Sequence, residues 1–112
     1  MNNLHINEVT QRVINVTRDT LGDQLDKIIL FGSYARGDFD DESDIDFCIL
    51  ANVPQSETGK LQVDIRKRLQ YIDLEYDVLV SLHVTGRDMF YNNLDILPYY
   101  MNIQREGVVL HG

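Results

Sequence analysis

Apolar residues near the start of the chain recur every three or four positions. Ile6, Val9, Val13 and Leu21 follow this spacing, which places their side chains on one face of an α-helix. Gly22 comes next, and glycine commonly stands just past the end of a helix. The pattern predicts one long amphipathic helix that ends at residue 21.

Three later runs have a composition that favours β-strands. Residues 27–31 form a short apolar run that stops at Gly32, as expected of a strand that is buried on both faces. Residues 44–50 form the second predicted strand. Residues 74–81 form a third, which is rich in β-branched and aromatic side chains. Strands separated by helical segments indicate an α/β fold.

Helical patterns lie between and after these strands. One helical turn is predicted at residues 34–37, and a second long helix places Leu61, Ile65, Leu69 and Ile72 on one face, with Ser56 as its N-cap. Residues 86–94 and 98–105 are predicted as short helices before the closing segment REGVVLHG. We therefore expect a small mixed β-sheet of about three strands with helices packed against it, in a single domain over residues 1–112.

The composition fits one folded domain and argues against a membrane protein. The chain has 112 residues, of which 44% are hydrophobic, enough to form a buried core. Its apolar runs fall far short of the roughly 20 residues that a membrane-spanning helix needs. The first residues show no basic region followed by an apolar one, and Cys48 is the single cysteine, so we predict neither a signal peptide nor a disulfide framework. We expect a cytoplasmic protein without a membrane partner.

The formal net charge of −8 bears on the choice of partner. A domain that grips nucleic acid normally presents a basic face to the phosphates. The main basic cluster here is Arg66, Lys67 and Arg68, and with Asp64 close by it is typical of a solvated helix face. Nucleic-acid binding is therefore not expected, whereas an acidic surface is compatible with a basic protein partner.

Two aspartates stand at the start of the second predicted strand, where apolar residues would be expected. Because residues two apart share one face of a strand, Asp44 and Asp46 point one way while Ile45 and Phe47 point toward the core. Adjacent carboxylates repel each other, and a divalent cation between them would relieve that repulsion. Magnesium is typically held by one or two carboxylates together with substrate phosphates. Taken alone, the pair is also consistent with a solvated acidic strand edge.

Gly32 and Ser33 directly follow the first predicted strand. Glycine lets the backbone approach a ligand closely, and backbone N–H groups beside a small hydroxyl suit phosphate oxygens. Taken alone, this pair is also consistent with a plain turn. Asp77 lies in the third predicted strand, from which it could reach the aspartate pair. Three carboxylates beside a phosphate-binding turn are the components of two-metal phosphoryl or nucleotidyl transfer.

The combined pattern GSYARG, SDIDFCIL and EYDVLV resembles the DNA polymerase β-like nucleotidyltransferase superfamily. The signature of that superfamily is Gly-Ser, a gap, Asp-x-Asp and a later Asp on a third strand. The short length and the GSYARG form are similar to its minimal, MNT-type members, as is the ending from Ile103 to Leu110. The resemblance covers nearly the whole chain and implies a minimal nucleotidyltransferase fold.

The resemblance also implies a role for each matching residue. Asp44 and Asp46 would hold two Mg²⁺ ions, and Asp77 would complete one of these sites as a metal ligand and as the catalytic base. Gly32 and Ser33 would contact the triphosphate of ATP.

Arg36 is a further candidate for phosphate binding, because a guanidinium offers a charged fork for phosphate oxygens. A capping or surface role for this arginine is an open alternative. The remaining acids of the loop are interpreted as solvated; they are Asp38, Asp40, Asp41 and Glu42.

Several other residues that could carry chemistry are assigned structural roles. His5 and His83 lack a partnered ligand spacing and are interpreted as ordinary surface or satisfied residues. Cys48 is interpreted as a packed thiol within its strand. Tyr99 and Tyr100 are interpreted as core residues rather than as a platform for a nucleobase.

Minimal members that the chain resembles act as antitoxins, encoded beside a helical HEPN ribonuclease toxin. The resemblance implies a type VII-like toxin–antitoxin system in which this chain is a protein adenylyltransferase that moves AMP from ATP to a toxin tyrosine. One alternative is an antitoxin that neutralises its toxin by contact alone. Another is the catalytic half of a small-molecule nucleotidyltransferase of the aminoglycoside-modifying type.

Overall fold

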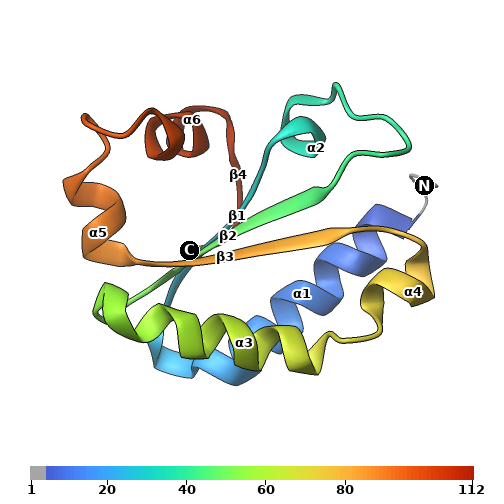
Figure 1. The fold of residues 1–112 in the computed structure, drawn as a ribbon, viewed down its shortest axis with the longest axis horizontal. Coiled ribbons are helices and arrows are strands. Elements are labelled where there is room, and N and C mark those ends of the chain that lie inside the picture. The colour runs from blue at the N-terminus through green and yellow to red at the C-terminus, as the bar shows by residue number, and fades with distance from the viewer. Residues whose placement is uncertain (1–4) are drawn as a thin grey trace.

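The computed structural model of the protein describes residues 5–112 (Figure 1). Its strands are β1 (Leu25–Phe31), β2 (Ile45–Ala51), β3 (Val80–Gly86) and β4 (Val108–His111). Its α-helices are α1 (Ile6–Leu21), α2 (Ser33–Arg36), α3 (Thr58–Arg68), α4 (Ile72–Tyr76), α5 (Arg87–Asn92) and α6 (Pro98–Glu106). Short 3₁₀-helices at Gly22–Gln24 and Gln55–Glu57 precede β1 and α3.

The strands form one sheet in the order β3-β2-β1-β4. β1 runs antiparallel to both β2 and β4, whereas β3 runs parallel to β2, so the sheet is mixed. This confirms the predicted α/β class with helices packed against a small mixed sheet. Residues 5–112 contain four strands rather than about three, because the closing segment Val108–His111 pairs with the free edge of β1.

Helices cover both faces of the sheet, as Figure 1 shows. α1, α3 and α4 lie on one face and enclose the larger core, whose fully buried side chains include Val13, Phe47 and Ile65. α5 and α6 cover the other face over a smaller core that contains Phe90 and Ile103. α2 lies beside α6 in this second layer, at one end of the sheet.

The first predicted helix is confirmed as α1. Val9, Val13 and Leu21 are buried, since helical spacing brings them onto one stripe facing the sheet. Gly22 ends the helix with a positive φ of 52°, and its N–H donates to the carbonyl of Arg18. No helix in the part of the chain that the structure describes has the length and apolar character needed to cross a membrane.

The third predicted strand was misplaced. Residues 72–76 form helix α4, and β3 begins only at Val80. The side chain of Asp73 explains the difference, because its Oδ1 accepts a hydrogen bond from the N–H of Val80 (3.1 Å) and its Oδ2 pairs with Arg66. The chain turns at Asp77, which has a left-handed backbone conformation (φ 52°). Local β-propensity was overridden here by contacts with the preceding helix α3 and with the start of β3.

The second long helix is α3, but Ser56 is not its N-cap. Ser56 lies inside the preceding 3₁₀-helix, and the cap position is Glu57. The Thr58 hydroxyl instead donates to the carbonyl of Gln55 (2.8 Å). The predicted face is buried at Ile65 and Leu69.

Candidate active site

The turn after β1 and the second strand meet at one end of the sheet. Phe31, the last residue of β1, pairs with Asp46 across the antiparallel ladder. Gly32 follows with a φ of 76°, and a Cβ built on it would collide with Oδ2 of Asp46. The backbone conformation therefore favours glycine at this position, and any larger residue would have to displace the Asp46 carboxylate.

Gly32 also starts the one-turn helix α2. Its carbonyl accepts hydrogen bonds from the N–H groups of Ala35 and Arg36 (both 3.1 Å). Ser33, the first residue of α2, is half-buried. The tight turn thus brings the serine and its backbone to the end of the sheet where the aspartates lie.

Asp44 and Asp46 flank the first residue of β2. Asp44 is exposed just before the strand, and Asp46 is half-buried within it. Burial raises the pKa of Asp46, and the neighbouring Asp44 carboxylate raises it further. Both effects disfavour the ionised form in the absence of a cation.

The donor set fits a magnesium ion. Two carboxylates in close proximity are the hard oxygen ligands that Mg²⁺ takes when it also binds substrate phosphates. Glycine at position 32 leaves room on the Asp46 side of the turn that a side chain would fill. A bound cation would also favour the ionised form of Asp46, whose pKa is raised in its absence.

Asp77 is not brought together with this pair. It caps the C-terminal end of α4, is exposed, and lines a hollow of about 330 Å³ with Ser43, Asp73 and Leu79. Over residues 5–112, no three His, Cys, Asp or Glu side chains gather as metal ligands would. The expectation that Asp77 faces the pair from a strand was wrong, because residue 77 lies in a turn; its role as a ligand stays a prediction.

Arg36 lies at the site but is engaged by carboxylates. Its Nε is 3.2 Å from Asp38 and its Nη1 is 3.5 Å from Glu106. It lines a hollow of about 190 Å³ between α2 and α6, together with Gly32 and Tyr99. A phosphate in this hollow would compete with the two acids for the guanidinium.

Two residues on β3, Ser81 and His83, were not predicted from the sequence to belong to the site. Ser81 lies directly opposite Asp46 in the parallel pairing, and His83 lies opposite Cys48. Ser81 and His83 are half-buried, whereas Val80 and Leu82 of the same strand are buried against the larger core. Apolar and polar residues alternate in the sequence VSLHV. For a strand that begins at Val80, this alternation puts Ser81 and His83 on one face and the apolar residues on the other.

The two adjacent tyrosines have different surroundings. Tyr100 is buried, as predicted, but Tyr99 retains 48% of its surface and lines the hollow beside Gly32, so its assignment to the core was wrong. Burial, helped by Cys48 and Asp46, raises the pKa of Tyr99 to about 12. Cys48 is buried as predicted, and burial raises the pKa of its thiol to about 12.

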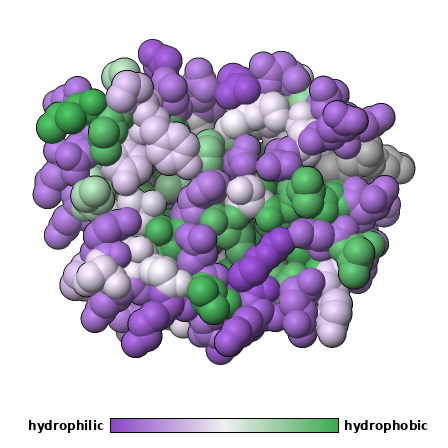
Figure 2. Space-filling view, viewed as in Figure 1, coloured by the Kyte–Doolittle hydropathy of each residue, from purple (hydrophilic) through white to green (hydrophobic). Residues whose placement is uncertain are grey.

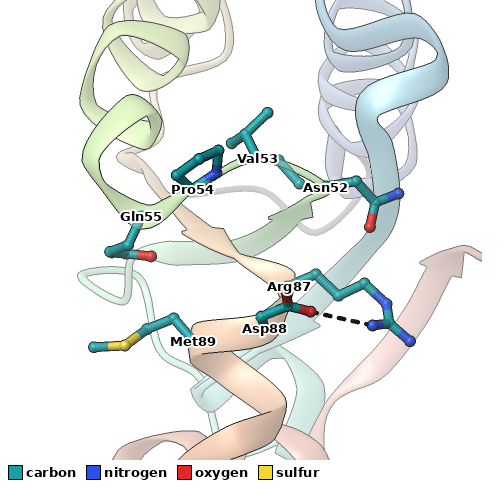
Figure 3. A pocket seen from close by; sticks show the side chains of 8 residues that line it. Asn52, Val53, Pro54, Gln55, Arg87, Asp88 and Met89 are labelled. Atoms are coloured by element: carbon teal, nitrogen blue, oxygen red, sulfur yellow. Dashed lines mark hydrogen bonds and ion pairs between the residues drawn. The ribbon is translucent and has the colours of Figure 1, made fainter.

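A wider hollow of about 420 Å³ lies at the other end of the sheet (Figure 3). Asn52, Gln55 and Met89 line it, and Arg87 pairs there with Asp88 at 3.4 Å. These residues follow the carboxyl ends of the parallel strands β2 and β3, whereas Asp46 lies near the amino end of β2. This hollow is therefore separate from the aspartate pair.

The sequence matches the family model described as "Nucleotidyltransferase domain" over residues 12–106. The chain belongs to this family. The match covers every residue of the Gly32–Asp46 site and of strand β3, so the predictions of a nucleotidyltransferase and of its fold are confirmed at the level of the family.

Two relatives from Methanocaldococcus jannaschii carry the name "Putative protein adenylyltransferase". MJ0604 is 33% identical over 98 residues, which cover 88% of this chain and 90% of the relative. MJ0141 is 51% identical over 61 residues, which cover 54% of this chain and 60% of the relative. The match to MJ0141 thus spans less than two thirds of that protein's length.

Solved structures share the fold. A chain in the crystal structure of a toxin–antitoxin with AMP-PNP superposes with a TM-score of 0.56 at 24% identity, over 91% of this chain and 72% of that one. A chain in a complex of tri-AMPylated Shewanella oneidensis HEPN toxin with MNT antitoxin gives a TM-score of 0.51 at 22% identity, over 95% and 71%. At these identities the likeness concerns the fold alone.

Proposed function

We propose that this protein is an antitoxin that transfers AMP from ATP to a tyrosine of a HEPN ribonuclease toxin. The observation that carries the proposal is the packing of Gly32 against the Asp46 carboxylate, which supports a turn that binds phosphate beside carboxylates that hold a metal ion. Support comes from family membership, from relatives named as protein adenylyltransferases and from fold neighbours solved as toxin–antitoxin complexes.

Each residue of the site has one task in this function. Asp44 and Asp46 hold Mg²⁺ together with the phosphates of ATP, and the backbone of Gly32 and Ser33 contacts the triphosphate. Bound magnesium supplies charge stabilisation for the phosphoryl oxygens and the leaving group. Arg36 can exchange its exposed acidic partners for phosphate, because surface ion pairs of this kind contribute little.

A protein acceptor fits the surroundings of the site better than a small molecule. Tyr99, which lines the hollow beside Gly32, keeps 48% of its surface exposed, and Ile96 and Met101 in the same segment of the chain keep 71% and 44%. Figure 2 shows apolar surface over the loop between α5 and α6, and further apolar surface across the middle of the same face. The net charge of −8 suits a basic partner that cuts RNA.

The direct test incubates the chain with Mg²⁺, ATP labelled at the α-phosphate and the toxin encoded beside it. We expect label on a toxin tyrosine, detected by peptide mass spectrometry as one or more AMP groups. The double variant Asp44→Asn, Asp46→Asn serves as the inactive control. An unlabelled toxin after incubation with folded protein and excess Mg·ATP would overturn the proposal.

Neutralisation by contact alone is a second candidate. It is favoured by the position of Asp77, which leaves the aspartate pair without a third clustered ligand among residues 5–112. Co-expression with the toxin separates the two functions. Growth that is rescued equally by the parent chain and by the Asp44→Asn, Asp46→Asn variant would point to contact alone, and loss of rescue would point to catalysis.

A further inference from the structure

We propose that His83 accepts the proton of the hydroxyl that attacks the α-phosphorus, and that Ser81 holds its imidazole in position. The inference deepens the function proposed above and rests on it. The sequence predicts a carboxylate, Asp77, on the strand beside the aspartate pair. In the structure, the strand beside β2 is β3, which carries Ser81 and His83 there.

Strand register puts the two residues on the face of the aspartate pair. Ser81 is the pairing partner of Asp46, and His83 is two residues further along the same strand. Residues at matched positions of parallel strands point to the same side, as do residues two apart. Val80, Leu82 and Val84 point to the opposite side and are buried, which confirms the orientation of β3.

The imidazole leans back toward the aspartates. Its Nε2 lies 3.0 Å from the Ser81 hydroxyl oxygen, so the ring is drawn along β3 in the direction of Asp46. The ring of Phe31, whose backbone pairs with Asp46, lies tilted against the imidazole at a centroid distance of 5.6 Å. The ring of Tyr99 lies in a T-shaped arrangement with the imidazole at a centroid distance of 6.3 Å. These contacts fix the ring while leaving it half-buried at the site.

The other titratable groups around this face are less suited to the task. Asp44 and Asp46 are committed to the cation, and Arg36 of α2 is a donor that cannot accept a proton. The Cys48 thiol is buried in the smaller core. The Tyr99 phenol of α6 has a raised pKa and stays protonated at neutral pH. Imidazole is the side chain that most often acts as a general base in enzymes.

The step is balanced without any further reactant. With Nε2–H of neutral His83 donating to the Ser81 hydroxyl oxygen, Nδ1 is the nitrogen that can accept a proton. The acceptor hydroxyl gives its proton to Nδ1 as its oxygen forms a bond to the α-phosphorus of ATP. The bond from that phosphorus to the bridging oxygen of the β-phosphate breaks, and pyrophosphate leaves with the electron pair. The Ser81 hydroxyl oxygen accepts from Nε2–H before and after the transfer, which holds the imidazole in this tautomer.

The test compares His83→Gln with the parent chain in single-turnover transfer of AMP to the toxin, across a range of pH. We expect the rate to fall by about 100-fold or more, as for loss of a general base, and the dependence of the rate on pH to differ from that of the parent. The thermal shift caused by Mg·ATP should be retained, because His83 is not a metal ligand. His111→Gln, a histidine on β4, is the matched control and should keep the parent rate and profile.

A second variant guards against a purely structural effect. His83→Ala leaves space at a half-buried site, and added free imidazole should restore part of the rate in proportion to its concentration. His83→Gln with the parent rate and pH profile, or loss of rate in His83→Ala without rescue and with a lost Mg·ATP shift, would overturn the inference. Absence of transfer by the parent chain at every pH would overturn the proposed function and this inference together.

Discussion

Gly32 lies directly against the Asp46 carboxylate, so that a methyl group at position 32 would collide with Oδ2. The turn after β1 and the face of β2 that carries Asp46 are therefore one structural unit. A change on either side of this contact should be felt by the bound nucleotide.

Gly32→Ala tests this contact. The alanine would have to adopt φ 76° and ψ −155°, a region that is essentially restricted to glycine and costs about 1–3 kcal/mol, and would also displace the Asp46 side chain. We expect a lower free energy of unfolding and loss of the Mg·ATP thermal shift. Gly37→Ala is the matched control, since its φ is also positive (84°) but its added Cβ meets nothing within 4 Å. It should lose stability through backbone strain and keep the shift; equal loss of the shift in both variants would contradict the prediction.

Asp46→Asn should change how stability depends on pH. The pKa of Asp46 is raised in the folded state, first by burial and then by Asp44. Its contribution to stability is therefore most favourable below the unfolded-state pKa, near about 4, and declines as the pH rises through the folded-state pKa.

In a chelator-containing buffer, Asp46→Asn should thus gain stability relative to the parent as the pH is raised from about 3 to about 7. Urea denaturation of both proteins at each pH measures the difference. A difference that stayed constant, or that moved in the opposite direction, would show that Asp46 is not destabilised by its surroundings.

Mg·ATP should stabilise the folded protein by mass action. At a ligand concentration of 100 times Kd the gain is about 2.7 kcal/mol, provided that the ligand binds only the folded state. Asp46→Asn should lose most of the gain, whereas Asp88→Asn, which alters an exposed acid in the separate hollow, should keep it. A melting shift that survives in Asp46→Asn would remove that residue from the metal site.

Asp73 should be important for the start of β3. Its carboxylate accepts from the Val80 N–H and pairs with Arg66. Asp73→Ala leaves both partners without it, and we expect a loss of about 2 kcal/mol in the free energy of unfolding. Asp64→Ala removes an exposed pair with Arg68 and should cost less than about 1 kcal/mol. Similar losses in urea denaturation would contradict the assigned role of Asp73.

The fold was predicted best where a signal lies within one continuous segment. The helix from Ile6 to Leu21 was placed correctly because its apolar stripe repeats within a single element. The meeting of Gly32 with Asp46 also follows from local order, because β1 and β2 are consecutive in the chain and pair as neighbours. The turn at Gly32 and the aspartate pair could therefore both be predicted from the sequence.

The position of the third strand could not be found in this way. The residues around Leu74 have strand-like composition, yet they form α4 because Ile72 is buried in the core and Asp73 binds Arg66 of a different helix. With the strand predicted at residues 74–81, His83 lay outside it and Asp77 was expected on a strand face. In the structure, His83 lies within β3 and Asp77 lies at the end of α4.

The order of residues in this chain was sufficient to determine its class, its first helix, the turn at Gly32 and Ser33 and the pair of aspartates, since each depends on neighbours in sequence. Tertiary structure alone decided which residues of β3 lie opposite Asp46. That choice depends on the register between strands that are more than 30 residues apart, and register is set by side chains that pack together only in the folded core.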